Sequence, residues 1–149
     1  MDIYGQMQRT IERLTTPGRG ILAADESYPT ITKRLAAHGI ESTEENRRAY
    51  RSLLATTPGI GEYVSGIIFF EETLKQKSDD GDLIPAACER HDIVPGIKVD
   101  KGLVELPGTR GEKATQGLDN LGDRLDGYVE QGALFTKWRN VYEITSSLP

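Results

Sequence analysis

The stretch "VPGIKVDKG" (residues 94–102) places a charged side chain inside a run that is otherwise typical of a buried strand. Lys98 stands between Ile97 and Val99. Strands of a parallel sheet are covered on both faces, so their sequences are almost continuously apolar. A charged side chain within such a strand must face a polar environment. In a barrel of parallel strands, that environment is the interior near the carboxyl ends. The stretch therefore predicts a site at the mouth of a barrel.

Similar runs recur along the chain, and each ends in ionisable residues. They are "GILAADES" (20–27), "YVSGIIFFEE" (63–72), the opening stretch, and "ALFTKWRNVYEI" (133–144). Segments with helical periodicity precede and separate them, at 5–14, 42–57, 85–91 and 118–132. This alternation predicts the α/β class, with a parallel sheet and helices on its faces.

Two of the helical segments carry patterns that predict their ends and buried faces. In the segment 42–57, Thr43 precedes two acids and is the expected N-cap. Tyr50, Leu53 and Leu54 share one face of this helix. In the segment 118–132, the predicted core face is Leu118, Leu121, Leu125 and Val129, and the helix is predicted to end at Gly132.

Length and composition limit the class of protein. With 149 residues, of which 37% are hydrophobic, the chain is predicted to form a single domain spanning 1–149. A net charge of −5 disfavours nucleic acid or an anionic membrane as a partner. The N-terminal "MDIYGQMQRTIERL" lacks the apolar core of a signal peptide, so a cytoplasmic location is expected.

The single cysteine, Cys88, has no second thiol for an intrachain disulfide or a zinc site. We interpret it as a buried structural thiol, and the alternative is a nucleophile assisted by His91. No metal and no cofactor are predicted.

The strand ends converge on one candidate site. Strand alternation places Gly96, Lys98 and Asp100 on one side of their strand, and the corresponding residues of two other strands are Ile21, Ala23 and Asp25, and Phe135, Lys137 and Arg139. Small residues at Ala23 and Gly96 are expected to leave space beneath the charges. Such a cationic cup suits an anion such as a sugar phosphate, with Asp25 moving a proton and the ammonium groups stabilising an oxyanion.

Structural alternatives exist for each of these residues. Asp25 could be a helix or turn cap, Lys98 and Lys137 could extend to solvent from edge strands, and Arg139 could pair with an acid. Glu71 and Glu72 are interpreted as solvated charges at a strand end. "GTRGE" (108–112) has the glycine content of a phosphate loop but follows no strand-to-helix fingerprint.

The motifs taken together resemble those of class I fructose-bisphosphate aldolases. They are "GRGILAADES", "TEENRRAYRSLL", "FFEETLKQKSDDG", "PGIKVDKG", "GTRGEKATQGLDNL" and "FTKWRNVYEI", in family order across residues 17–144. The resemblance implies a (β/α)8 TIM barrel, of which this chain holds about the first four β/α units, a half barrel. It also implies reversible cleavage of fructose 1,6-bisphosphate to dihydroxyacetone phosphate and glyceraldehyde 3-phosphate through a lysine Schiff base.

The resemblance assigns roles residue by residue. Asp25 resembles the aspartate that handles the C4 hydroxyl proton, and Lys137 the lysine that orients substrate and stabilises charge. The remaining matches are to substrate-binding positions: Thr30, Arg34, Arg47, Lys98 and Arg139. Thr30 stands where the family has a serine near a phosphate, and the surrounding "SYPT" (27–30) departs from the family's small residues.

The family's Schiff-base lysine and general acid/base glutamate lie on later strands, so a truncated chain that is inactive alone is expected. Ser146 or Ser147 is the predicted N-cap of a further helix. At full length a homo-oligomer is expected, since the family commonly forms tetramers. The alternative is a non-catalytic half barrel that binds sugar phosphates or assembles through its open edges.

Overall fold

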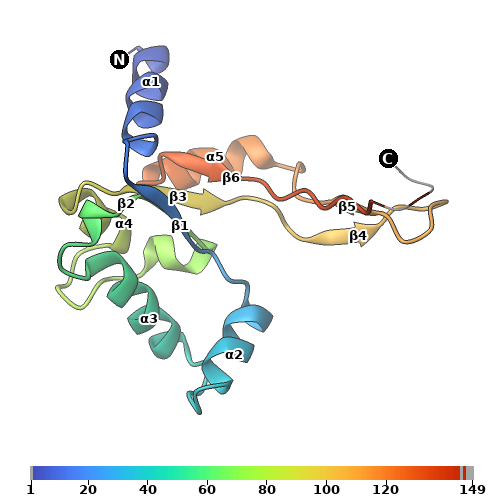
Figure 1. The fold of residues 1–149 in the computed structure, drawn as a ribbon, viewed down its shortest axis with the longest axis horizontal. Helices are drawn as coiled ribbons and strands as arrows, with labels where there is room; N and C mark the ends of the chain where they lie inside the picture. The colour runs from blue at the N-terminus through green and yellow to red at the C-terminus, as the bar shows by residue number, and fades with distance from the viewer. Residues whose placement is uncertain (1, 145, 147–149) are drawn as a thin grey trace.

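A computed structural model describes residues 2–144 and 146 and contains one main parallel sheet (Figure 1). Its strands are β1 (Gly20–Ala24), β2 (Val64–Phe69), β3 (Val94–Lys98) and β6 (Phe135–Lys137), in the order β1-β2-β3-β6. The predicted α/β class and the four strand-forming runs are confirmed. Four neighbouring parallel strands that do not close on themselves are the arrangement expected for half of an eight-stranded barrel.

The register of the sheet brings the carboxyl ends of the strands together. Phe69 of β2 lies opposite Ala24 of β1 and Ile97 of β3. Lys98 at the end of β3 lies opposite Lys137 at the end of β6. Residues that follow these positions therefore gather at one edge of the sheet.

Helices precede and connect the strands; the core residues that cover the outer face of the sheet come from α3, α4 and α5, whereas α1 and α2 project away from the sheet (Figure 1). They are α1 (Ile3–Leu14), α2 (Tyr28–Ala36), α3 (Glu44–Thr56), α4 (Ile84–Arg90) and α5 (Leu121–Glu130), with short 3₁₀ turns η1 (Ile60–Glu62) and η2 (Glu71–Lys75). Thr43 caps α3 as predicted, because its Oγ1 accepts a hydrogen bond from the Asn46 amide at 3.1 Å. Within residues 2–144 and 146, no helix is long and apolar enough to cross a membrane.

The predicted buried face of α3 was wrong in part. Leu54 packs against the core, but Leu53 is 63% exposed, and the buried residues of this helix are Arg51, Ser52 and Ala55. Arg51 is buried because its guanidinium donates to the Glu72 carboxylate after β2 and to the Glu26 main-chain oxygen after β1. An apolar count cannot find a helix face that is buried by ion pairing.

The prediction for α5 also needs correction at both ends. Leu121 and Leu125 pack against the core as expected, while Leu118 lies before the helix and is 71% exposed. Val129 is 64% exposed, and Tyr128 beside it is buried instead. The tyrosine ring fills the core position, which turns Val129 away from the sheet.

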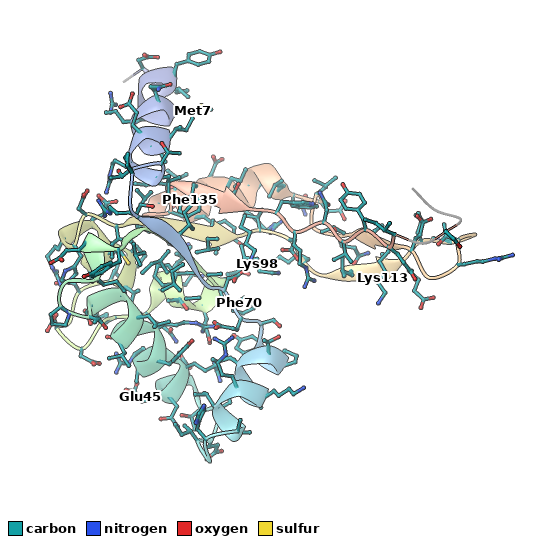
Figure 2. The ribbon with its side chains drawn as sticks, viewed as in Figure 1. Met7, Glu45, Phe70, Lys98, Lys113 and Phe135 are labelled. Carbon is teal, nitrogen blue, oxygen red and sulfur yellow. The ribbon has the colours of Figure 1, made fainter. Side chains whose placement is uncertain are left out.

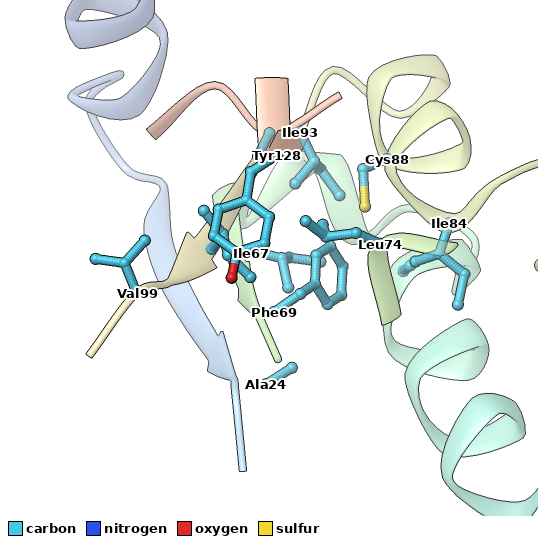
Figure 3. Packing of buried hydrophobic residues seen from close by; sticks show 12 residues of the cluster. Ala24, Ile67, Phe69, Leu74, Ile84, Cys88, Ile93, Val99 and Tyr128 are labelled. Carbon is cyan, nitrogen blue, oxygen red and sulfur yellow. The ribbon is translucent and has the colours of Figure 1, made fainter. Parts of the chain in front are cut away.

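The core lies between the outer face of the sheet and the helices (Figure 3). Its members are Ala24, Ala55, Ile67, Phe69, Leu74, Ile84, Cys88, Ile93, Ile97, Val99, Tyr128 and Ala133. They come from strands β1 to β3, from the helices, and from the turns between them. The core therefore holds the strands in register from one side and leaves their other face to form the interior of the barrel.

The interior face is filled by a ring from the edge strand. A Cβ atom at Gly96 would overlap the ring of Phe135, and one at Gly66 would overlap Leu14 from the end of α1. The space that we expected beside Gly96 is thus occupied by Phe135. Below the level of Lys98 the interior is therefore packed beside β2 and β3, whereas Ile21 and Ala23 on the interior side of β1 are exposed.

A hairpin that the sequence did not predict extends away from the sheet (Figure 1). Its strands β4 (Leu103–Glu105) and β5 (Lys113–Thr115) pair antiparallel, and "GTRGE" lies in the loop between them. Three-residue strands leave too short a pattern to detect. At the C-terminus, Ser146 lies in a turn, and Ser147 lies outside the described residues.

We predict that Gly96→Ala destabilises the chain by about 1–3 kcal/mol, because the added methyl group displaces the Phe135 ring in a packed interior. Urea unfolding measures the change. Gly127→Ala is the matched control: it lies within α5 with open space around it, and alanine is there expected to stabilise the helix by about 0.5–1 kcal/mol. Equal unfolding midpoints for Gly96→Ala and the parent would contradict the packing of the Phe135 ring against Gly96.

Candidate active site

A cavity of about 520 Å³ lies at the carboxyl edge of the sheet. Lys98 and Phe70 mark its position in Figure 2. Its lining includes Asp25, Thr30, Lys98, Lys137 and Arg139 from the predicted site, together with Glu26, Ser27, Pro29, Phe70, Glu71, Asp100, Lys101 and Gly102. Five of the seven predicted site residues therefore surround one hollow.

An ion pair joins the two outermost strands across this cavity. Lys137 Nζ, at the end of β6, donates a hydrogen bond to Asp25 Oδ2, just after β1, at 2.7 Å. In a flat sheet these strands would lie about 14 Å apart, three strand spacings. The direct contact thus requires the sheet to curl, as the wall of a barrel does. Asp25 is no helix cap, since the N-cap of α2 is Ser27.

A second ion pair fixes Lys98. Its Nζ donates to Asp100 Oδ1 at 2.8 Å and to the Asp100 main-chain oxygen at 3.1 Å. The Asp100 side chain is fully buried, and the Gly102 amide also donates to it. Lys98 and Lys137 are 13% and 32% exposed, so neither extends freely into solvent. Lys98 interrupts an apolar strand because it faces this cavity and a buried carboxylate.

The remaining two predicted residues of the lining are held less tightly. Thr30 Oγ1 lies 3.3 Å from Ser27 Oγ at the start of α2. Arg139 is exposed, and among the described residues its guanidinium has no ion pair. Its main-chain oxygen accepts a hydrogen bond from Thr115 of the hairpin at 2.7 Å. Arg139 is therefore available to an anion entering the cavity.

Arg34 and Arg47 do not line the cavity. Arg34 is ion-paired with Glu26 and donates to the Tyr50 hydroxyl at 2.9 Å. Arg47 forms two hydrogen bonds to the Glu72 carboxylate, at 2.8 and 3.0 Å. Each arginine is thus bound to a glutamate at a strand end and does not line the cavity itself. Their assignment as substrate ligands stays a prediction.

The interpretation of Glu72 as a solvated charge was wrong. Its side chain is 12% exposed and accepts hydrogen bonds from both Arg47 and Arg51. Burial favours the neutral acid, but these two arginines outweigh it and hold the pKa of Glu72 below its ordinary value.

Glu71 differs from its neighbour because it lines the cavity and is 45% exposed. Lys101 Nζ donates to its carboxylate at 2.8 Å, and this hydrogen bond lowers the pKa of Glu71. The pair was missed because the two residues come from different strand ends, which a pattern within one segment cannot connect.

The charge balance of the lining differs from the cationic cup that we expected. Four acids and four bases line the cavity: Asp25, Glu26, Glu71 and Asp100 against Lys98, Lys101, Lys137 and Arg139. Each lysine is paired with one of the carboxylates. The cavity thus offers fixed ammonium groups and one unpaired guanidinium. Among the described residues, no three His, Cys, Asp or Glu side chains are placed to hold a metal ion.

Comparison with known proteins identifies the family. Residues 6–149 match the family model described as "Fructose-bisphosphate aldolase class-I". The chain belongs to the class I fructose-bisphosphate aldolase family. It is 53% identical to fructose-bisphosphate aldolase 7, cytosolic, of Arabidopsis thaliana over 97% of the chain and 40% of that relative. It is 54% identical to the chloroplastic aldolase of Oryza sativa subsp. japonica over 93% of the chain and 36% of that relative.

A solved aldolase confirms the fold of this half barrel. The chain superimposes on a fructose-bisphosphate aldolase of Plasmodium falciparum, crystallised with TRAP and a small-molecule inhibitor, with a TM-score of 0.87 and 50% identity. The match covers 91% of this chain and 39% of the solved one. The 149-residue chain thus spans about two fifths of the length of these relatives.

Cys88 is a structural thiol rather than a nucleophile. It is fully buried in the core, and burial raises its pKa to about 12. Near neutral pH it therefore stays a protonated thiol, and no reactive thiolate forms.

We accordingly predict that iodoacetamide at about pH 8 alkylates native Cys88 roughly tenfold or more slowly than it alkylates the same chain in urea. Mass spectrometry of timed samples measures both rates. Equal rates in the two conditions would show that the thiol is accessible.

Proposed function

We propose that this chain forms the N-terminal half of a fructose-bisphosphate aldolase and contributes one wall of its active site. The substrate class is a sugar phosphate, and the reaction is the reversible cleavage of fructose 1,6-bisphosphate to dihydroxyacetone phosphate and glyceraldehyde 3-phosphate. The observation that carries the proposal is the Asp25–Lys137 ion pair at the cavity of a half barrel with aldolase relatives.

The geometry suggests how this wall acts. The Asp25 side chain accepts a hydrogen bond from Lys137 Nζ and lines the cavity, so it is placed to accept a proton from a substrate hydroxyl. When that proton moves, Lys137 becomes free to stabilise negative charge that develops on the substrate oxygen. The Schiff-base lysine and the general acid/base glutamate come, in this proposal, from the strands that complete the barrel.

The cations at the rim bind and orient the phosphate groups. Arg139 has no carboxylate partner among the described residues. Its exposed guanidinium is therefore the first cation that an entering substrate contacts. Lys98 lies deeper, and Thr30 offers a hydroxyl donor from α2. Arg34 is half-exposed beside Glu26 and reaches a phosphate at this rim, whereas Arg47 does so only by leaving Glu72.

We further propose that the full-length enzyme works in the cytoplasm as a homo-oligomer. Relatives include both cytosolic and chloroplastic aldolases, which agree on the reaction and differ in compartment. The open edges at β1 and β6 need further strands to cover them, whatever the assembly.

A chimera tests the proposal. The chain replaces the matching N-terminal part of the Arabidopsis thaliana cytosolic relative, and cleavage of fructose 1,6-bisphosphate is measured. We expect an active enzyme in which Lys137→Met lowers kcat by about 100-fold or more, because the charge on the substrate oxygen loses its ammonium partner. Cys88→Ala, in the core, is the control and is expected to leave kcat within about threefold.

An inactive but folded chimera would overturn the catalytic proposal and favour a half barrel that only binds sugar phosphates. Comparable kcat values for Lys137→Met and Cys88→Ala would remove Lys137 from the catalytic residues.

For the 149-residue chain alone, we predict no covalent adduct with dihydroxyacetone phosphate under borohydride. Lys98 and Lys137 each form an ion pair with a carboxylate, and neither is placed as a free amine that could attack a carbonyl. Mass spectrometry detects the adduct, and the active chimera is the positive control. A stable adduct on either lysine would contradict their electrostatic role.

A further inference from the structure

Arg51 is the largest side chain that is fully buried, although it is charged. It lies in the middle of α3, far from the solvent that would hydrate its guanidinium. A buried ion pair contributes little net stability compared with apolar residues of the same size, because both charges lose their hydration. A buried guanidinium in this place therefore points to a requirement for geometry rather than for stability.

The contacts of Arg51 connect the ends of two neighbouring strands. Its Nη1 donates to Glu72 Oε1, just after β2, at 2.7 Å. Its Nη2 donates to the main-chain oxygen of Glu26, just after β1, at 2.8 Å. One planar guanidinium thus spans both strand ends, which a lysine ammonium cannot do with the same fixed geometry.

Glu26 is the residue that follows Asp25, and it is held from two sides. Arg51 fixes its main chain, and Arg34 of α2 pairs with its carboxylate. Glu26 is only 8% exposed. With Glu26 fixed, the backbone that carries Asp25 has little freedom to rotate, and the carboxylate is directed at Lys137.

We propose that Arg51 is a positioning residue that holds Asp25 in the geometry for proton transfer, acting through the main chain of Glu26. This inference rests on the proposed aldolase function for its effect on catalysis. Arg47 supports it from the same helix face, four residues away, by orienting Glu72 with two hydrogen bonds. Glu26 lines the cavity, and Arg34, Arg47, Arg51 and Glu72 lie behind it and hold this part of the wall rigid.

The test uses the chimera described above with Arg51→Lys and Arg51→Met. We expect kcat to fall about tenfold for Arg51→Lys and about 100-fold for Arg51→Met, because a small displacement of a catalytic group is costly. The KM for fructose 1,6-bisphosphate is expected to change little, since Arg51 does not line the cavity. Arg48→Met is the matched control: Arg48 is an arginine of α3 that pairs with Glu45 and Asp79, and its loss leaves kcat unchanged.

A double-mutant cycle separates positioning from general loss of structure. If Arg51 acts through Asp25, then Arg51→Lys in an Asp25→Asn background lowers kcat by less than about twofold more. If the two losses multiply instead, Arg51 does not act through Asp25, and the proposal is overturned.

Hydrogen exchange gives a readout that does not depend on activity. In Arg51→Lys, we expect the amides of residues 25–27 to exchange about tenfold faster, while those of α5 keep their rate. Unchanged exchange at 25–27 would overturn the positioning role even if the chimera has no aldolase activity. Faster exchange in an inactive parent chimera would uphold the positioning and reject only the proposed function.

Discussion

The ion pair between Asp25 and Lys137 is the constraint around which the site is built, since it joins the first and last strands of the sheet at 2.7 Å. Strand pairing alone fixes neighbours, and it leaves the overall curl of an open sheet to the twist of the strands. A contact between the two outer strands fixes the curl of the sheet at its carboxyl edge. The same interaction that shapes the sheet also fixes the position of the proposed proton acceptor.

Pairing governs the whole cavity. Lys98, Lys101 and Lys137 each meet a carboxylate, so their positions are fixed before a ligand arrives. Preorganised charges act more strongly than mobile ones, because little reorganisation remains when the reaction develops charge. The formal balance of acids and bases also explains how several cations remain close together without mutual repulsion expelling them.

Strand alternation was enough to predict much of the site. Residues on one side of a strand reach the same face, and this placed Asp25, Lys98, Lys137 and Arg139 around one cavity before the fold was known. The same reasoning found the four parallel strands from their apolar runs. The strands were found from continuous apolar runs and the site from alternation along a strand, and a single segment displays both patterns fully.

The features that were missed depend on contacts between distant segments. Arg51 has a buried place only because Glu26 and Glu72 lie beside it, and the apolar pattern of α3 points to Leu53 instead. The hairpin of β4 and β5 is too short to show a period. One signal was present in the sequence: Arg47 and Arg51 are four residues apart, so a helix presents them together to the acids that end β2.

The Phe135 ring limits the sides from which a ligand can reach the site. It covers Gly66 and Gly96, and Leu14 from α1 lies against Gly66 beside it, so the half of the barrel nearest the amino ends is closed on this side. Beside β2 and β3, a ligand can therefore approach the site from the carboxyl edge and not from the amino ends. Under the proposed function, substrate and products would share that side of the site.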